Sequence, residues 1–232
     1  MRNGGWLHRE NDAPRYVQPI RKAIEDRPID TLGMWRRWFD ATDYQRLDVL
    51  GILLGVDTDA LKAIGCAWAA SYNAWAFPMK DATGKVIGIR LRNDAGDKWA
   101  VKGSKSGLFI PERYPIDFDG TLWLTEGPTD LAAALSLGLF SIGRPACLGQ
   151  EGFILDYLRI IKARRLVIIT DNDEPGIRGA EKLQKQLPVL SCVWVPPVKD
   201  IREYLNRGGN RRMIESSIKD LVWTKANRSM AA

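Results

Sequence analysis

The sequence is poor in the residues that most often bind transition metals. Its 232 residues include one histidine, His8, and three cysteines, Cys66, Cys147 and Cys192, with no Cys-x-x-Cys pair. A structural zinc site from this chain alone is therefore not expected, because such sites need four clustered cysteine or histidine ligands. Three scattered thiols are typical of a reducing compartment, so we expect a cytoplasmic protein.

Long apolar segments and two familiar catalytic motifs are also missing. The N-terminus has no signal-peptide core, and the longest apolar run, near Val49 to Val56, is too short to span a bilayer. We therefore expect no membrane partner. Neither a Ser-His-Asp arrangement nor a Gly-x-x-x-x-Gly-Lys phosphate loop is present, so an NTP-hydrolysing motor within the chain is not expected.

The composition is that of a basic globular protein. Apolar residues make up 45% and charged residues 27% of the chain, and the formal net charge is +6. The basic excess lies in two segments, 80–113 and 199–228, each with eight basic and four acidic residues. This distribution favours a polyanionic partner that approaches the region between them.

Acidic residues follow two apolar runs in the region between the basic segments. The runs are Leu122–Gly127, which contains Glu126, and Leu166–Gly176, which contains Asp171 and Asp173. Each run is typical of a buried parallel strand, and ligands collect at the carboxyl ends of such strands. Carboxylates gathered there repel one another unless a cation lies among them, and Mg²⁺ prefers oxygen ligands. The pattern therefore predicts a magnesium site and phosphate chemistry.

Local explanations for these carboxylates stay open. Asp171 and Asp173 also suit an Asx turn that caps the next helix, and Glu126 suits the positive end of the helix after it. Glu174 is a candidate for a water-mediated contact or for a simple surface charge. Asp130, four residues after Glu126, is a further candidate for the site.

The segment that carries these acids alternates strand and helix patterns, which predicts a mostly parallel sheet flanked by helices. One helix begins at Pro128 and ends near Gly138, a second has one apolar face, and a third runs from about Gly176 to Leu187. The second helix carries its apolar face on Phe153, Tyr157, Leu158 and Ile161. Strands are expected at 121–125, 140–147, 165–170 and 191–195.

The first 115 residues predict three kinds of structure. An irregular arm extends to about residue 30, and helical spacing follows from Thr31 to Gly65. Trp35 and Trp38 in this region indicate packing, with base stacking as the alternative. Short strands joined by turns then predict a small antiparallel sheet between residues 74 and 111. Basic residues are expected on one side of this sheet, namely Lys85, Arg90, Arg92, Lys98, Lys102 and Lys105.

The acidic segment resembles the Toprim domain over residues 120–205. The resemblance is carried by Glu126-Gly127, by Asp171-x-Asp173-x-x-Gly176 and by Val198-Lys199-Asp200. This domain is shared by DnaG-type primases, type IA and type II topoisomerases, OLD-type nucleases and RecR proteins. The resemblance implies that Glu126, Asp171 and Asp173 are catalytic and that Asp200 completes their metal cluster.

The preceding segment resembles the small subdomain before Toprim in DnaG-type and in phage or plasmid primases. Its residues are FPMKDATGKVIGIRLRNDAG followed by KWAVKGSKSGLFIP. The match implies that Arg90, Arg92, Lys102 and Lys105 face template or nucleotide phosphates. The resulting organisation is an arm and helical region at 1–73, a basic β subdomain at 74–115, a Toprim-like α/β domain at 116–205, and a C-terminal helix and tail at 206–232.

Together the resemblances imply a primase-type nucleotidyltransferase that makes short primers on single-stranded DNA with Mg²⁺ or Mn²⁺. The implied partners are the template, nucleoside triphosphates, and a replicative helicase or a separate zinc-ribbon protein. The zinc ribbon with which DnaG-type primases usually begin has no counterpart here. A Toprim nuclease and a non-catalytic nucleic-acid-binding module of a replication complex are therefore the alternatives.

Overall fold

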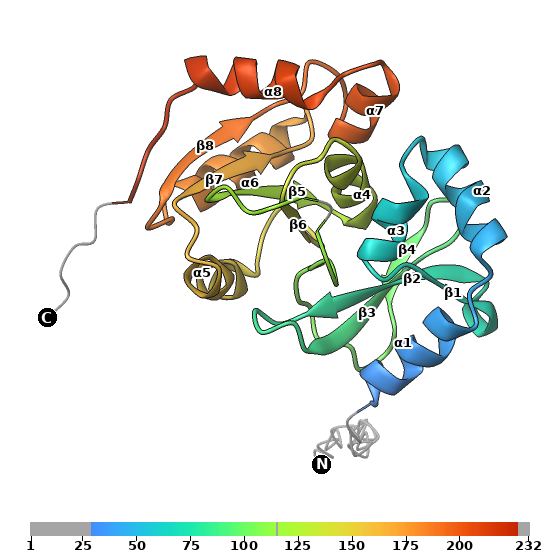
Figure 1. Cartoon of the computed structure of the whole chain (residues 1–232). Helices are drawn as coiled ribbons and strands as arrows, with labels where there is room; N and C mark the ends of the chain where they lie inside the picture. The colour runs from blue at the N-terminus through green and yellow to red at the C-terminus, as the bar shows by residue number, and fades with distance from the viewer. Residues whose placement is uncertain (1–28, 115, 227–232) are drawn as a thin grey trace, which may run out of the picture.

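Two four-stranded sheets lie side by side in the protein, one antiparallel and one parallel (Figure 1). The computed structural model describes residues 29–114 and 116–226. Of the arm expected up to about residue 30, only residues 29 and 30 are described. The end of the expected C-terminal tail, residues 227–232, also lies outside the described residues. No helix in the described part of the chain is long and apolar enough to cross a membrane.

Three helices precede the antiparallel sheet: α1 (Thr31–Asp40), α2 (Tyr44–Leu54) and α3 (Thr58–Ala63). Aspartates begin the first two, because the side chains of Asp30 and Asp43 accept hydrogen bonds from backbone N–H groups in the first turn. In α1, the Trp35 side chain is buried and its indole N–H donates to the Gly65 carbonyl at 2.8 Å. Trp35 therefore packs in the core, as the helical spacing indicated.

The antiparallel sheet has the strand order β1-β2-β3-β4. Its strands are β1 (Ala67–Ala69), β2 (Ala74–Lys80), β3 (Val86–Arg92) and β4 (Lys98–Ala100), and the 3-10 turn η1 (Ala70–Tyr72) joins the first two. β1 lies within residues 1–73, which the sequence assigned to the arm and helical region, just after the helical pattern ends at Gly65. Three residues are too few to show the alternation that marks a strand, so the sheet begins earlier than expected.

A strap of chain ties this sheet to the parallel one. Leu108 exchanges two backbone hydrogen bonds with Lys80 of β2, and the next residue, Phe109, exchanges two with Gly143 of β6. The buried Lys80 ammonium also donates to the Ile110 carbonyl at 2.7 Å and to the Glu112 carboxylate at 2.6 Å. Both sheets are therefore held at a fixed spacing by backbone and side-chain bonds.

The parallel sheet has the order β6-β5-β7-β8. Its strands are β5 (Thr121–Glu126), β6 (Ser141–Arg144), β7 (Arg165–Ile169) and β8 (Leu190–Trp194). β6 was expected to extend to residue 147, but it ends at Arg144 because Pro145 has no N–H to continue the hydrogen-bond ladder. The other three strands match the expected positions to within one residue at each end.

Helices cover both faces of the parallel sheet (Figure 1). On one face α4 (Pro128–Ser136), α7 (Ile201–Asn206) and α8 (Arg211–Ser217) pack on strand residues such as Trp123 and Ile169. On the other, α5 (Glu151–Ile160) and α6 (Glu174–Gln184) pack on the alternate residues, such as Leu124 and Ile168. The 3-10 turn η2 (Ile218–Asp220) follows α8. The first of these cores continues into the antiparallel sheet through Phe77 and Phe109, so one apolar core joins the two halves.

The strand order places a switch point between β5 and β7. The chain leaves β5 to form β6 on one side of it and then returns to form β7 on the other side. Connections diverge at such a point and leave a crevice at the carboxyl ends of the two strands, where ligands of open α/β sheets bind. Glu126 ends β5 and Thr170-Asp171 follows β7, so the acidic residues lie at this crevice.

Candidate active site

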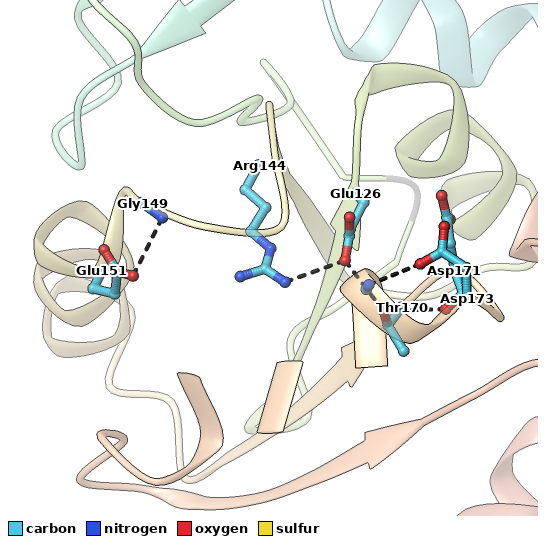
Figure 2. A network of polar contacts seen from close by, with 8 residues as sticks. Glu126, Arg144, Gly149, Glu151, Thr170, Asp171 and Asp173 are labelled. Atoms are coloured by element: carbon cyan, nitrogen blue, oxygen red, sulfur yellow. Dashed lines mark hydrogen bonds and ion pairs between the residues drawn. The ribbon is translucent and has the colours of Figure 1, made fainter. Parts of the chain in front are cut away.

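Glu126 is held at the crevice by two neighbours (Figure 2). Its Oε1 accepts a hydrogen bond from the Thr170 hydroxyl at 3.2 Å and pairs with the Arg144 guanidinium, also at 3.2 Å. Arg144 is opposite Glu126 in the β5–β6 register, and its side chain is only 1% exposed. The Glu126 side chain is 14% exposed. A buried guanidinium needs a counter-charge, so the ion pair and the Thr170 hydrogen bond fix the orientation of Glu126.

The loop after β7 carries both Asp171 and Asp173, but their carboxylates have different partners. The Asp173 side chain accepts a hydrogen bond from the Gly176 N–H at 2.8 Å and so caps α6. No hydrogen bond or ion pair from the described residues reaches the Asp171 carboxylate. Local sequence allowed both aspartates to be caps, but only Asp173 takes that part, which leaves the Asp171 oxygens free for a ligand.

Asp200 is brought to the same loop by the backbone. The Asn172 N–H donates to the Lys199 carbonyl at 2.8 Å, which places Asp200 beside the turn after β7. The Asp200 side chain caps α7 by accepting from the Glu203 N–H at 2.7 Å, and it lies 3.7 Å from Arg202. Asp200 is thus near the other acids, while its carboxylate is already engaged.

The electrostatics of the site show that these acids affect one another. Burial raises the pKa of Asp171 to about 6, and repulsion by Glu126, Asp200 and Asp173 adds to the effect. The pKa of Asp130 rises to about 8, first through burial and then through Asp171 and Asp200. Asp130 is in the first turn of α4, and no described residue forms a hydrogen bond with it. Burial and mutual repulsion therefore both disfavour the charged forms of Asp130 and Asp171.

Basic residues of the antiparallel sheet face these acids across one pocket. The pocket has a volume of about 110 Å³, and Glu126, Asp130 and Asp171 line its acidic side. On the other side are side chains of β3 and β4, namely Arg90, Arg92 and Lys98. Arg90 and Arg92 are two residues apart on one strand and so point to the same face. A group with phosphates would contact the basic side while a hard cation binds the acidic side.

The structure brings together only part of the site that the sequence predicted. Glu126, Asp171, Arg90 and Arg92 line the pocket. Lys102 and Lys105 do not line it, because they are exposed in the loop after β4. Glu174 is also exposed and pairs with Arg178 on α6, as a surface charge does.

Sequence reasoning did not select three residues that the structure places here. Lys98 belongs to the basic set of the small sheet, but only the β3–β4 pairing shows that it reaches the pocket. Arg202 follows Asp200 by two residues in an unremarkable helix start. Arg144 ends an otherwise apolar strand. A charged residue in such a strand predicts a buried ion pair, because buried charges need partners.

Comparison with known proteins identifies the architecture. No protein-family model matches the sequence. The gene 57 protein of Mycobacterium phage D29 is 26% identical over 156 residues, which are 65% of this chain and 97% of that protein. The primase fragment of the bacteriophage T7 primase-helicase protein aligns with a TM-score of 0.58 at 19% identity and covers 71% of each chain. The DnaG primase catalytic domain bound to single-stranded DNA aligns with a TM-score of 0.61 at 13% identity, over 83% of this chain and 80% of that one.

The chain has the fold of a primase catalytic core. This confirms the resemblance to DnaG-type and phage primases that the two sequence segments indicated. It also confirms the expected fold class, a parallel sheet flanked by helices and preceded by a smaller antiparallel sheet. At these identities the likeness concerns the fold, and the chemistry of the site rests on its own residues.

The primase-core fold raises the question of a bound cation. In residues 29–114 and 116–226, no three histidine, cysteine, aspartate or glutamate side chains are arranged to hold one ion. The expected cluster of Glu126, Asp171, Asp173 and Asp200 is therefore not formed in this arrangement. The reason is that three of the four are engaged, two as helix caps and one with Arg144. The free carboxylates of Asp171 and Asp130 nevertheless suit a hard cation, because they are mutually repelling oxygen donors.

Replacing Asp130 with asparagine is expected to stabilise the metal-free protein at alkaline pH. Its pKa is about 8 in the folded state, against roughly 3.9 for an aspartate in an unfolded chain. A carboxyl whose pKa is raised on folding makes its full contribution to the free energy of unfolding below about pH 4. This contribution is lost as the pH rises through 8. At pH 9 the free energy of unfolding of the Asp130→Asn protein should exceed that of the parent by at least about 1.4 kcal/mol, which is the free energy equivalent of one pKa unit. Urea unfolding with a chelator at pH 5, 7 and 9 tests this, and a difference that does not depend on pH would contradict it.

Proposed function

We propose that this protein is a primase-type nucleotidyltransferase that joins nucleotides on a single-stranded DNA template. The observation that carries the proposal is the pocket in which Arg90, Arg92 and Lys98 face Glu126, Asp130 and Asp171. A nucleoside triphosphate suits a pocket with these two sides. Its phosphates can bind guanidinium and ammonium groups, and charge that develops at its reacting phosphorus needs to be neutralised. Alignment with a DnaG catalytic domain bound to single-stranded DNA supports the choice of template.

The residues divide the work of phosphoryl transfer between the two sides of the pocket. Arg90, Arg92 and Lys98 bind the triphosphate and orient it for in-line attack. The 3′-oxygen of the growing strand forms a bond to the α-phosphorus, while the bond to the β-phosphate breaks and pyrophosphate leaves. The proton of the 3′-hydroxyl passes to a carboxylate on the acidic side of the pocket, which Glu126, Asp130 and Asp171 line.

The proposed cation is Mg²⁺ or Mn²⁺, held by Asp171 and Asp130, with Glu126, Asp173 and Asp200 around it. Such an ion neutralises charge on the phosphates and lowers the pKa of a bound hydroxyl. Arg144 and Thr170 hold the Glu126 carboxylate in place at the pocket. We further propose a replicative helicase or a zinc-ribbon protein as a partner, because similar cores belong to the T7 primase-helicase protein and to an Aquifex aeolicus primase with a zinc-binding domain.

The deciding experiment is primer synthesis by the isolated chain. The protein is incubated with single-stranded DNA, labelled ribonucleotides or deoxynucleotides, and Mg²⁺ or Mn²⁺, and the products are separated by length. Template-dependent oligomers that require the divalent ion are the expected result. Nicking of supercoiled plasmid without nucleotides, in place of oligomers, would identify a nuclease. DNA binding alone, with neither activity on any template, would indicate a non-catalytic module.

Two lysine variants test whether the pocket or the loop after β4 binds the phosphates. Lys98→Ala is expected to weaken nucleoside triphosphate binding about tenfold, because a lost charge-assisted contact costs roughly 1.5 kcal/mol. Lys102→Ala, which removes the same charge outside the pocket, should change the affinity less than about twofold. Calorimetric titration of both variants at one ionic strength gives the comparison. Equal losses would show that the loop after β4, and not the pocket, holds the phosphates.

A further inference from the structure

Arg92 also lines a second pocket, next to the first. This pocket has a volume of about 310 Å³, at the lower end of the range for sites that bind small organic ligands. α2 and β2 supply an apolar side, and the turn after β3 and the starts of α4 and α7 supply a polar side. The lining residues are Leu50, Leu53, Leu54, Trp75, Phe77, Arg92, Asn93, Asp94, Thr129 and Arg202.

The apolar side presents more hydrophobic surface to solvent than folding requires. Leu53 is 75% exposed on α2, whereas Trp75 and Phe77 line the pocket from β2 and are buried. Leu53 is therefore the apolar lining residue with the largest exposed fraction, and it offers an apolar ligand a contact surface. Exposed apolar groups that line a pocket with polar groups at its rim mark binding sites more often than isolated ones do.

The polar side carries two arginines, neither of which forms a short ion pair with a described carboxylate. Arg92 donates to the Thr129 hydroxyl at 3.1 Å, and Arg202 pairs with Asp200 at the long distance of 3.7 Å. Burial lowers the pKa of Arg92 and repulsion by the nearby Arg202 adds to this, while the charges of Asp130 and Asp200 act in the opposite direction. An anion between the two guanidinium groups would relieve their repulsion, and phosphate oxygens match the geometry of guanidinium donors.

We propose that this second pocket binds a nucleobase whose phosphate lies on Arg92 and Arg202. The proposal rests on the proposed function, because it places a nucleotide directly beside the one that reacts. Its support is the combination of an apolar side with an exposed leucine, two neighbouring arginines and a residue shared with the acidic pocket. The nucleotide belongs either to the single strand or to a free nucleoside triphosphate, and the two sources share this chemistry.

Two exposed residues of α2 provide the test and its control. Leu53 lines the pocket, and its neighbour Ile52 is 80% exposed but does not line it. Neither side chain contributes to the core, so serine at either position should leave the fold intact. Leu53→Ser should weaken binding about five- to tenfold, at the lower end of the effect of removing a surface on which a base stacks. Ile52→Ser should match the parent protein.

Three probes separate the base from the phosphates and the strand from the free nucleotide. They are ATP, inorganic tripolyphosphate and a single-stranded oligodeoxynucleotide without terminal phosphates, each titrated into the full chain. Tripolyphosphate has no base, so Leu53→Ser should bind it like the parent. A loss with ATP assigns the pocket to a free nucleotide, and a loss with the oligonucleotide assigns it to the strand. Equal binding of both by Leu53→Ser and Ile52→Ser would overturn the proposal, as would an equal loss for tripolyphosphate.

The same preparations are assayed for primer synthesis, so that the two proposals can fail separately. Without oligomer products, a loss confined to Leu53→Ser still supports a nucleobase pocket, whereas the proposed function fails. With oligomer products and no difference between the two serine variants, the function stands and the pocket is not a nucleobase site. Such a result would leave the apolar surface of α2 to a partner protein.

Discussion

Replacing Asp171 with asparagine is expected to reduce nucleotidyl transfer by at least about a thousandfold while the fold stays intact. Asp171 lines the acidic side of the pocket with a carboxylate that no described residue engages. The change removes a negative charge and a proton acceptor where the reacting groups meet, and losses of this size follow when a group that stabilises the transition state is removed. Stability should rise slightly without metal, because Glu126 and Asp173 no longer repel a charge at this position.

The control for Asp171 is three residues further along the chain, at the first residue of α6. Glu174 is exposed and pairs with Arg178, so Glu174→Gln should keep the parent rate within about twofold. Single-turnover extension of a labelled primer, with saturating nucleotide and ion, gives the chemical rate for both variants. A Glu174→Gln loss as large as that of Asp171→Asn would show that the loop and not the Asp171 carboxylate matters. Full activity in Asp171→Asn would contradict its catalytic role.

The second large effect concerns stability. Glu126→Gln is expected to lower the free energy of unfolding by about 3 kcal/mol, because it leaves the buried Arg144 guanidinium without a counter-charge. Adding Arg144→Met should recover most of this loss, since an apolar side chain of similar length then occupies the space. The asymmetry follows from burial: a lone charge is costly there, whereas a well-packed neutral pair is tolerated.

Urea unfolding of the parent, both single variants and the double variant measures the interaction as a double-mutant cycle. The exposed pair formed by Arg159 and Asp156 is the matched control, and Asp156→Asn should change stability by less than about 0.5 kcal/mol. An additive cycle for Glu126 and Arg144 would contradict the ion pair. The activity of the double variant should stay low, because the recovered fold lacks the Glu126 charge.

Much of this architecture could be predicted from the sequence because its signals are local. The runs before Glu126 and Asp171 are apolar and short, so both strand ends could be placed, and their acids could be assigned to one edge. Spacing predicted that Arg90 and Arg92 share one face of a strand, and the resemblance to primases assigned that face to phosphates. In each case the information lies within about ten residues of chain.

The remainder of the site depends on contacts between distant segments. Arg144 meets Glu126 only because β6 is the neighbour of β5, and Asp200 approaches only through the bond from Asn172 to Lys199. The exclusion of Lys102 and Lys105 follows from where β4 ends. For Asp173 the local pattern allowed a cap and a ligand equally, and only the three-dimensional turn shows the cap. Strand order and loop contacts are not encoded within a short window, so these features could not be derived.

The strap formed by Leu108 and Phe109 has a consequence for substrate selection. Because it bonds to β2 on one side and to β6 on the other, the basic and acidic sides of the pocket belong to a single stiff frame. Enzymes that close on their substrates use the energy of the correct fit to assemble the site, which adds discrimination. If the proposed function holds, a site that does not close can discriminate between nucleotides only by how well they fit its preformed shape. We therefore expect nucleotide selection to depend on base pairing with the template, and the error rate to be that of base pairing in a preformed site.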